Sequence, residues 1–466
     1  MLMLGRGLLL FIGLAIVALL TRELGVDGFG IYRVAIAYLG LVVVLADFGL
    51  ASIFVRDISR DGANQTSIVG PLLLLRLVIS ILVMILAILF SFVLGFSDET
   101  RAGILLGATG YVAYSTHLLL FGVFQQKLKQ QGVIFAEIVG ALLFVAVILF
   151  CRGKNVPASI FVGLFGASYA VTFIMSIYFA NRLVPIRVAY DLKLWIGTLQ
   201  TAAPLAIAGI LGVMYVRADT VLLALFHPPA EAGIYGVPIK ISDSIMGITL
   251  LFSGLMAPIL ANSASQNRAD FVRVFSDALG VLIVGVVCVA ILIFVGAEDI
   301  VYLLAGDEFL SGAPILRVLV VFMTLHAATL LMREATVSLG IQSRILPVYV
   351  MAVCLAAIAY ALLVPTRGGE GAALTLVITE SFVTCGIATV IFRNVDEPIS
   401  YWTPLRVLAC GAATIVMYQM IVPQNWGTLY AAGAAMIIYF ALLLLSRTLK
   451  LSRVYSLLSE MLGARR

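Results

Sequence analysis

Ionisable residues inside otherwise apolar stretches are the part of this sequence best placed to do chemistry. A charged side chain within hydrocarbon costs several kcal/mol unless it faces a partner or a water-filled cavity, so each one needs an explanation. Such residues often bind charged substrates or ions. The residues in this position are Arg33, Arg76, Arg217, Lys240, Arg317, Arg333, Asp47, Glu137, Asp219, Asp243, Glu334 and Glu380.

Several of these charges have a structural explanation. Arg76 lies close enough to the start of its apolar stretch for its long side chain to reach the headgroup region. Arg317 and Arg333 lie near the two ends of one stretch. Asp47 precedes Phe48 and a glycine at the end of another stretch, where it would order a helix end.

Arg217 and Lys240 lie deeper. At a rise of 1.5 Å per residue, Arg217 is ~13 Å from one end of its stretch and Lys240 is ~12 Å from the start of the next. Lys240 and Asp243 share a helix face, so they are able to neutralise each other. Arg217 and Asp219 are two residues apart and do not face each other, so each needs another partner.

The backbone around Lys240 is expected to be irregular. Gly233, Gly236 and Pro238 precede it and weaken a helix. Irregular backbone at membrane depth is tolerated where it lines a cavity or packs on protein.

A short internal repeat relates Arg33 to the same region. Residues 29–36 read FGIYRVAI and residues 232–239 read AGIYGVPI, so Arg33 aligns with Gly236, one helical turn from Lys240. An even number of spans separates the copies, which gives both the same orientation in the membrane. This predicts a pseudo-two-fold axis along the membrane normal, with a substrate path between the halves.

From these positions we hypothesise a positively charged lumen lined by Arg33, Arg217 and Lys240. It would favour an anionic substrate, and a diphosphate suits the guanidinium fork well. The alternative is that each cation makes a separate structural pair.

The elements that must position these charges are membrane-spanning helices. The chain is 62% hydrophobic and 11% charged, with a mean hydropathy of +1.14, which no water-soluble surface would allow. About twenty apolar residues span a bilayer, so we expect an all-α polytopic membrane protein of about 14 helices. The predicted spans are 3–20, 28–53, 68–95, 103–124, 131–150, 157–180, 198–226, 232–260, 276–296, 311–332, 345–364, 370–392, 404–422 and 427–446.

The cations outside the spans sort strongly by side. With the N-terminus in the cytoplasm, 18 Lys and Arg residues lie inside and 5 lie outside, as the positive-inside rule expects. Both termini are therefore predicted to be cytoplasmic. The net charge of +5 is explained by inside-facing loops that meet anionic lipid, so no nucleic-acid partner is expected.

The repeat and the spans together predict the domain organisation. We expect an N-terminal six-helix lobe at 1–182, a cytoplasmic linker at 183–197 and a C-terminal six-helix lobe at 198–393. Residues 394–466 would add helices 13 and 14 and a basic cytoplasmic tail. No polar domain is long enough to act on soluble substrates, and no nucleotide-binding or metal-ligand motif is present. We therefore expect a protein that is not an enzyme and has no cofactor.

Motifs along the whole chain resemble those of Wzx-type oligosaccharide flippases, members of the multidrug/oligosaccharidyl-lipid/polysaccharide exporter superfamily. Each motif is short, and their order and spacing carry the resemblance. They are LTRELGVDGFGIY at 20–32, LADFGL at 45–50, Asp219, AGIY at 232–235, Pro258, LAGDEF at 304–309, LG at 339–340 and GGEGAA at 368–373.

The resemblance implies two six-helix lobes with alternating access to a central cavity. The implied substrate is an oligosaccharide on undecaprenyl diphosphate, moved across the bacterial inner membrane for O-antigen (lipopolysaccharide), capsule or exopolysaccharide synthesis. Relatives couple transport to ions, which makes Asp219, Asp243 and Glu380 candidates for ion coupling. The implied partners are the lipid-linked oligosaccharide, membrane lipids, a polysaccharide polymerase and a chain-length regulator.

Three alternatives remain open. A lipid II flippase of the same superfamily also has fourteen helices and a cationic cavity. A drug exporter with the related fold is expected to have twelve helices and an acidic cavity. A membrane-embedded polymerase, ligase or glycosyltransferase is expected to carry a large outer loop, whereas the outer loops here are short.

Overall fold

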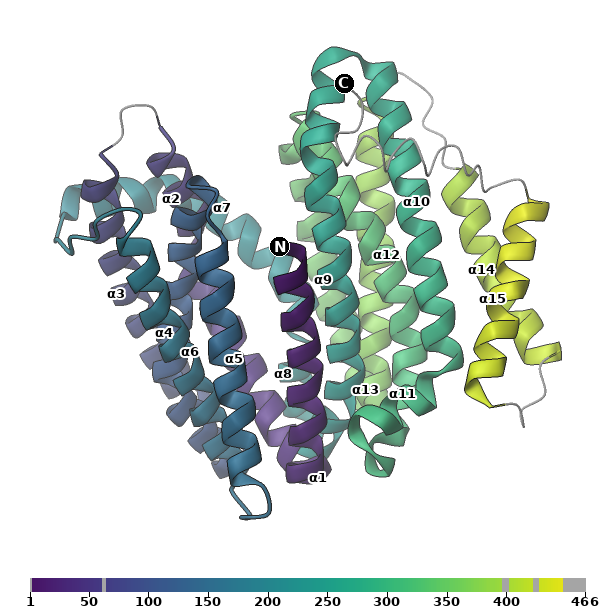
Figure 1. Ribbon diagram of the computed structural model, residues 1–466, viewed down its shortest axis with the longest axis horizontal. Helices are drawn as coiled ribbons and strands as arrows, with labels where there is room; N and C mark the ends of the chain where they lie inside the picture. The colour runs from purple at the N-terminus through teal and green to yellow at the C-terminus, as the bar shows by residue number, and fades with distance from the viewer. Residues whose placement is uncertain (1, 61–63, 396–401, 422–426, 447–466) are drawn as a thin grey trace. The chain divides into compact units, whose positions relative to one another are not determined.

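The computed structural model describes residues 2–60, 64–395, 402–421 and 427–446, without the side chains of 2–3 and 204–214. These residues form helices joined by short connections, and no strand occurs among them, which confirms the predicted all-α class (Figure 1). The predicted basic tail, 447–466, lies outside the described residues.

The helices follow one another along the chain with few long connections. They are α1 Leu2–Asp47, α2 Leu50–Ile58, α3 Gln65–Ser91, α4 Asp98–Gln126, α5 Gln131–Cys151, α6 Ala158–Asn181, α7 Leu192–Arg217, α8 Asp219–Phe226, α9 Pro229–Gln266, α10 Arg268–Val295, α11 Ala297–Ala305, η1 Asp307–Gly312, α12 Ala313–Ser338, η2 Gln342–Ile345, α13 Leu346–Phe392, α14 Trp402–Ile421 and α15 Thr428–Leu445.

These helices accommodate all the predicted spans. Eleven helical segments of the described chain are long and apolar enough to cross a membrane. α13 contains two predicted spans that meet at a kink, and α1 contains the first predicted span and residues 28–47 of the second, joined at another kink. The predicted span 28–53 is too long, because α1 ends at Asp47 and α2 begins at Leu50. The 26 residues of α7, together with α8, account for the predicted span 198–226.

A glycine forms each kink. Gly25 in α1 has a φ of 63° and Gly368 in α13 has a φ of 54°, a region that other L-residues rarely adopt. A kink frees backbone N–H groups that need an acceptor. The Glu231 carboxylate accepts a hydrogen bond from the N–H of Gly369 at 2.8 Å, and so supports the second kink.

The irregular backbone lies in a different place from the one predicted. α9 is continuous through Pro238 and Lys240, so the expected irregularity around Lys240 is wrong. The preceding span is broken instead, because α7 ends at Arg217 and α8 begins at Asp219. The Asp219 carboxylate accepts a hydrogen bond from the N–H of Thr220 at 2.6 Å, a local bond of the kind that competes with helix continuation.

Internal packing divides the chain into two compact units. Unit 1 comprises residues 1–237, 304–309 and 360–372. Unit 2 comprises residues 238–303, 310–359 and 373–466. In unit 1, α4 packs most extensively on α6, and in unit 2, α10 packs on α12, α14 and α15. The six-helix lobes drawn from the sequence stay a prediction.

The two copies of the internal repeat meet within unit 1. A Cβ on Gly30 would lie 1.8 Å from the carbonyl oxygen of Pro229, and a Cβ on Gly233 would lie 2.3 Å from that of Val26. Each glycine therefore faces the carbonyl group four residues before the other glycine. Such reciprocity is what a local two-fold axis produces, and it brings the backbones of α1 and α9 into direct contact.

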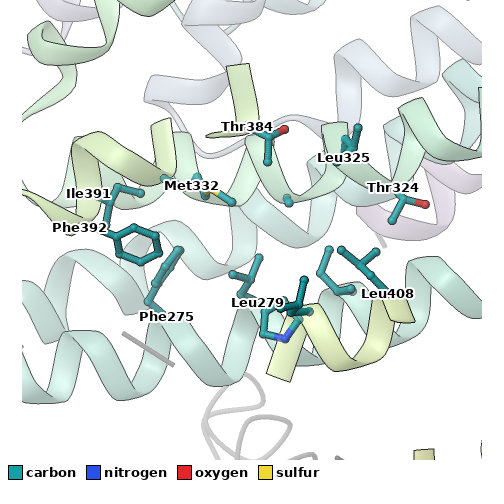
Figure 2. A pocket seen from close by; sticks show the side chains of 14 residues that line it. Phe275, Leu279, Thr324, Leu325, Met332, Thr384, Ile391, Phe392 and Leu408 are labelled. Carbon is teal, nitrogen blue, oxygen red and sulfur yellow. The ribbon is translucent and has the colours of Figure 1, made fainter. Parts of the chain in front are cut away.

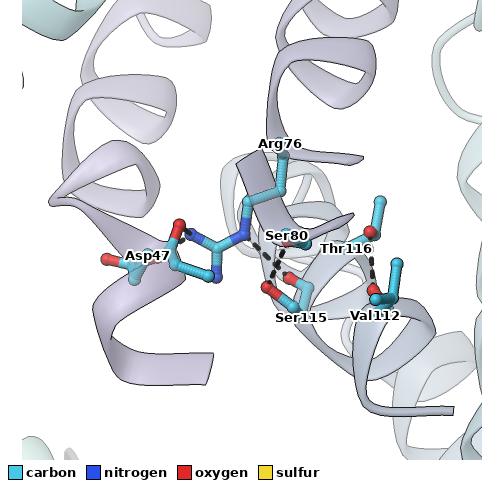
Figure 3. A network of polar contacts seen from close by, with 7 residues as sticks. Asp47, Arg76, Ser80, Val112, Ser115 and Thr116 are labelled. Atoms are coloured by element: carbon cyan, nitrogen blue, oxygen red, sulfur yellow. Dashed lines mark hydrogen bonds and ion pairs between the residues drawn. The ribbon is translucent and has the colours of Figure 1, made fainter. Parts of the chain in front are cut away.

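A buried arginine holds the end of α1 in unit 1. Arg76 on α3 is 0% exposed, so the prediction that it reaches the headgroup region is wrong. Its guanidinium donates to the carbonyl oxygens of Ala46 at 2.9 Å and Ser115 at 3.1 Å, and forms an ion pair with Asp47 at 2.8 Å (Figure 3). The Asp47 side chain is 33% exposed. Asp47 thus orders a helix end, as expected from the sequence, with Arg76 as its partner.

Replacing Arg76 is expected to destabilise the protein. Arg76→Met leaves a carboxylate and two carbonyl groups without their donor, at a cost of about 3 kcal/mol. The matched control is Arg101→Met, because Arg101 pairs at 2.7 Å with an Asp98 side chain that is 98% exposed. Such a surface pair contributes about 0–1 kcal/mol. Thermal unfolding of the purified protein in detergent measures both, and equal midpoints for the two variants would contradict the prediction.

Gly30 and Gly40 offer a second matched comparison on α1. Gly30→Ala places a methyl group against backbone that has no room to move, at a cost of about 1–3 kcal/mol or more. A Cβ on Gly40 meets nothing within 4 Å, so Gly40→Ala is expected to be neutral or to gain up to about 1 kcal/mol of helix propensity. The same thermal measurement tests this, and a Gly30→Ala protein as stable as Gly40→Ala would refute the close contact.

Candidate functional site

The structure places two of the three predicted lumen cations in unit 1. Arg33 is half-buried on α1, and Arg217 is exposed at the end of α7. The side chain of Arg33 runs along Gly236, where a Cβ would lie 2.8 Å from its Cγ. The Nε of Arg33 is buried and has no hydrogen-bond partner among the described residues. Lys240 is half-buried on α9 in unit 2, so the shared lumen stays a prediction.

Asp219 is a buried carboxylate held by three donors. Its Oδ1 accepts from the N–H of Thr220 at 2.6 Å and from the Thr220 hydroxyl at 3.3 Å. Its Oδ2 accepts from the hydroxyl of Tyr235 at 2.5 Å. The carboxylate lies in the first turn of α8, where the helix dipole favours negative charge. Asp219 thereby ties the broken span to α9.

Glu380 is fully buried in unit 2. Its Oε1 lies 3.2 Å from Nδ1 of His326 on α12. Beside this pair, the hydroxyls of Thr329 and Thr384 lie 2.9 Å apart, and Thr384 also donates to the carbonyl oxygen of Glu380 at 2.7 Å. The third predicted acid, Asp243, is half-buried on α9.

A polar cluster that the sequence did not reveal joins four helices of unit 1. Arg6 on α1 forms an ion pair with Glu137 on α5 at 2.7 Å. The other carboxylate oxygen of Glu137 lies 3.5 Å from Nε2 of the buried His117 on α4. Nδ1 of His117 lies 3.0 Å from the hydroxyl of Ser176 on α6. Neither Arg6 nor His117 was a predicted site residue, because their partners are remote in the sequence.

A group of stacked aromatic rings on α4 and α6 lies beside this cluster in unit 1. Tyr114 stacks on Tyr169 with ring centroids 4.2 Å apart, and it also lies parallel to His117 at 6.3 Å. Tyr111 meets Tyr169 edge-on at 5.4 Å, and Phe165 lies 4.6 Å from the same ring. The sequence indicates this aromatic group only through helical spacing, at residues 111, 114 and 117 on α4 and residues 165 and 169 on α6.

Unit 2 contains an apolar pocket of about 280 Å³ among α10, α12, α13 and α14 (Figure 2). Of its fourteen lining residues, only Thr324 and Thr384 have polar side chains, and both hydroxyls donate to backbone carbonyl oxygens. The volume is nearly twice that of the ~150 Å³ cavity that holds a benzene molecule. The other lining residues are Phe275, Leu279, Ile283, Leu325, Ala328, Met332, Ala388, Ile391, Phe392, Pro404, Leu405 and Leu408.

In the part of the chain that the structure describes, no group of three or more His, Cys, Asp or Glu side chains is arranged to hold a metal ion.

Comparison with known proteins identifies a family whose sequence model matches more than half of the chain. The sequence model of the polysaccharide biosynthesis proteins matches residues 1–264. No curated protein matches the chain by sequence.

Solved structures of transporters share the fold. The lipid II flippase MurJ in an inward closed conformation aligns with a TM-score of 0.79 at 12% identity, over 95% of this chain and 98% of that chain. An inward-facing multidrug resistance MATE family transporter of the MOP superfamily aligns with a TM-score of 0.60 at 14% identity, over 83% and 98%. The eukaryotic MATE transporter AtDTX14 aligns with a TM-score of 0.63 at 15% identity, over 84% and 93%. At these identities the likeness shows the fold alone.

The hydrogen bond from Tyr235 to Asp219 is testable by comparing two buried tyrosines. Tyr38 donates to a neutral acceptor, the carbonyl oxygen of Ala87, at 2.6 Å. A hydrogen bond to a charged group contributes about 1.5–3 kcal/mol, whereas a neutral one contributes about 0.5–1.5 kcal/mol. Tyr235→Phe is therefore expected to lower the thermal midpoint in detergent more than Tyr38→Phe. Equal losses would contradict a stronger hydrogen bond from Tyr235 than from Tyr38.

Proposed function

The chain belongs to the polysaccharide biosynthesis protein family, as its motifs predicted, and from this premise we propose that it flips lipid-linked oligosaccharides. The substrate is an oligosaccharide repeat unit on undecaprenyl diphosphate. The protein moves it across the bacterial inner membrane for O-antigen, capsule or exopolysaccharide synthesis. The fold that it shares with transporters of the MOP superfamily supports a role in transport.

The observation that carries the proposal is the apolar pocket of unit 2. A protein that moves an amphiphile needs an apolar surface for the hydrocarbon tail besides a polar path for the head. The pocket lies on four helices long and apolar enough to cross a membrane, and it offers an almost wholly apolar lining. We assign it to a segment of the prenyl chain, because burying each methylene group contributes about 0.8 kcal/mol.

The diphosphate is assigned to Arg33, Arg217 and Lys240. Two observations support the assignment: the Nε of Arg33 has no hydrogen-bond partner in the described part of the chain, and Arg217 is exposed. A guanidinium group binds phosphate oxygens in a bidentate manner, and an ammonium group adds a mobile point charge. The cavity they form would open to each side of the membrane in turn, by movement of the two lobes.

Ion coupling is assigned to the buried or half-buried acids Asp219, Asp243 and Glu380. Glu380 has the strongest support, because it is fully buried 3.2 Å from a histidine nitrogen. A change of protonation or ion occupancy there alters the charge inside a low-dielectric region, and such a change favours one conformation over another.

Location and partners complete the proposal. The asymmetric distribution of Lys and Arg supports an orientation with both termini in the cytoplasm. A polysaccharide polymerase and a chain-length regulator would receive the repeat unit on the outer side.

A lipid II flippase is the second candidate, and the likeness to MurJ favours it. Lipid II also joins a prenyl tail to a diphosphate, so the same pocket and cations would serve it. The two candidates differ in the sugar that the lipid carries.

Lipid extraction from a strain that lacks the protein tests the proposal. We expect undecaprenyl-diphosphate oligosaccharide to accumulate on the cytoplasmic side, with loss of surface polymer. Accumulation of lipid II instead would support the second candidate. Complete repeat units that reach the outer leaflet but stay unpolymerised would overturn both, and would indicate an enzyme.

Complementation of this strain tests the assigned residues. Ala388→Phe fills the apolar pocket, and displacing two methylene groups of a bound chain loses about 1.6 kcal/mol, or about 15-fold in affinity. We expect surface polymer to fall with Ala388→Phe but not with Ile378→Phe, a change on the same helix at an exposed position outside the pocket. Equal amounts of surface polymer from both variants, at equal expression, would remove the pocket from the mechanism.

Arg33→Ala is expected to reduce transport in the same assay, because its guanidinium is assigned to the diphosphate.

A further inference from the structure

A second pocket lies on unit 1, and the transport proposal does not use it. It has a volume of about 420 Å³ and lies between the end of α2 and the start of α7. These two helices pack on each other in unit 1 (Figure 1). From the α2 side it is lined by Arg56, Asp57 and Arg60. From the α7 side it is lined by Asp191, Lys193, Leu194, Gly197, Thr198 and Thr201.

The charges of this pocket leave two cations available. Asp57 forms an ion pair with Arg56 at 2.8 Å. The Asp191 carboxylate accepts from the N–H of Leu194 at 2.9 Å and so begins α7. Both acids are therefore engaged locally. Arg60 and Lys193 form no ion pair with any other residue that the structure describes.

The floor of the pocket is built for a polar group. Thr198 is only 4% exposed, and its hydroxyl has no hydrogen-bond partner in the described part of the chain. A buried hydroxyl without a partner costs about 1–3 kcal/mol, which a bound acceptor would recover. One position earlier, a Cβ on Gly197 would meet nothing within 4 Å, so the backbone leaves space beside the hydroxyl.

The surroundings of the pocket are those of a membrane–water interface. Val188, Tyr190, Leu192 and Ile196 are exposed apolar or aromatic residues on the same segment. Tyr190 packs edge-on against Trp195 at 5.0 Å, and the indole N–H of Trp195 donates to the carbonyl oxygen of Pro71 at 2.9 Å. Tyr and Trp concentrate where an apolar ring meets the headgroup layer. A ligand of this pocket would therefore reach it from the lipid headgroups.

We propose that this pocket binds the phosphate group of an anionic phospholipid. Arg60 and Lys193 supply the charge, and Thr198 donates a hydrogen bond to a phosphate oxygen, while the acyl chains lie along the exposed apolar residues. The bound lipid would join α2 to α7. This assignment requires a membrane-embedded chain, and it holds whether or not the protein transports an oligosaccharide.

The test measures lipid preference of the full-length protein in nanodiscs or mixed micelles. Native mass spectrometry and thermal unfolding compare phosphatidylglycerol with phosphatidylcholine. We expect phosphatidylglycerol to bind preferentially and to raise the unfolding midpoint. The double change Arg60→Gln and Lys193→Gln is expected to weaken phosphatidylglycerol binding about 30-fold, as for two cations that face an anionic lipid. Identical binding of the two lipids to the unaltered protein would overturn the proposal.

Matched variants distinguish a specific binding site from a general effect of surface charge. Lys127→Gln with Lys129→Gln removes the same charge after α4, outside the pocket, and is expected to leave the preference intact. Equal weakening by both pairs would overturn the proposal.

Thr198→Val removes the hydroxyl without a change in charge, and is expected to reduce the preference for phosphatidylglycerol severalfold without loss of folding. Inorganic phosphate is the final probe, and binding as tight as that of phosphatidylglycerol would refute the lipid assignment.

Discussion

The close contact between Gly30 and Gly233 determines how α1 and the start of α9 pack against each other in unit 1. Because a carbonyl oxygen occupies the place of each missing Cβ, α1 and the start of α9 approach at backbone distance. The residues that follow each glycine are then placed by helix geometry alone. Arg33 and Gly236, each three residues after one of these glycines, lie against each other. Tyr235, two residues after Gly233, donates a hydrogen bond to Asp219. The candidate cation and the buried carboxylate therefore depend on a contact that contains no side chain.

Charge neutralisation is the second constraint on the fold. Hydrocarbon does not solvate ions, so Arg76 and Arg6 each find a carboxylate and further acceptors or aromatic contacts on other helices. The same rule brings His326 to within 3.2 Å of Glu380 in unit 2. These pairs set the rotation of their helices, since a rotated helix would leave a charge facing lipid.

The sequence predicted the helical class, the spans and the family, because each depends on patterns within about twenty residues. It also aligned Arg33 with Gly236, positions that are in contact in the structure. It predicted that Arg76 reaches the headgroup region, whereas the side chain is buried. The position of a residue along a span does not show which face of the helix packs against protein. It missed the Arg6–Glu137 pair and the Tyr114–Tyr169 stack, because periodicity describes one helix and not which helices become neighbours. The break at Ala218 was also missed; the Asp219 carboxylate next to it accepts a hydrogen bond from the N–H of Thr220, which hydrophobic periodicity does not reveal.

The Arg6–Glu137 ion pair also has a consequence for the synthesis of the protein on the ribosome. The two residues are 131 positions apart, so at about 5–20 residues per second the arginine precedes its partner by roughly 7–26 s. Asp47, by contrast, is already made when Arg76 emerges. Arg6 on α1 thus has no counter-charge from Glu137 until the fifth predicted span has been synthesised. The ion pair that joins α1 to α5 therefore forms only after α5 has been made.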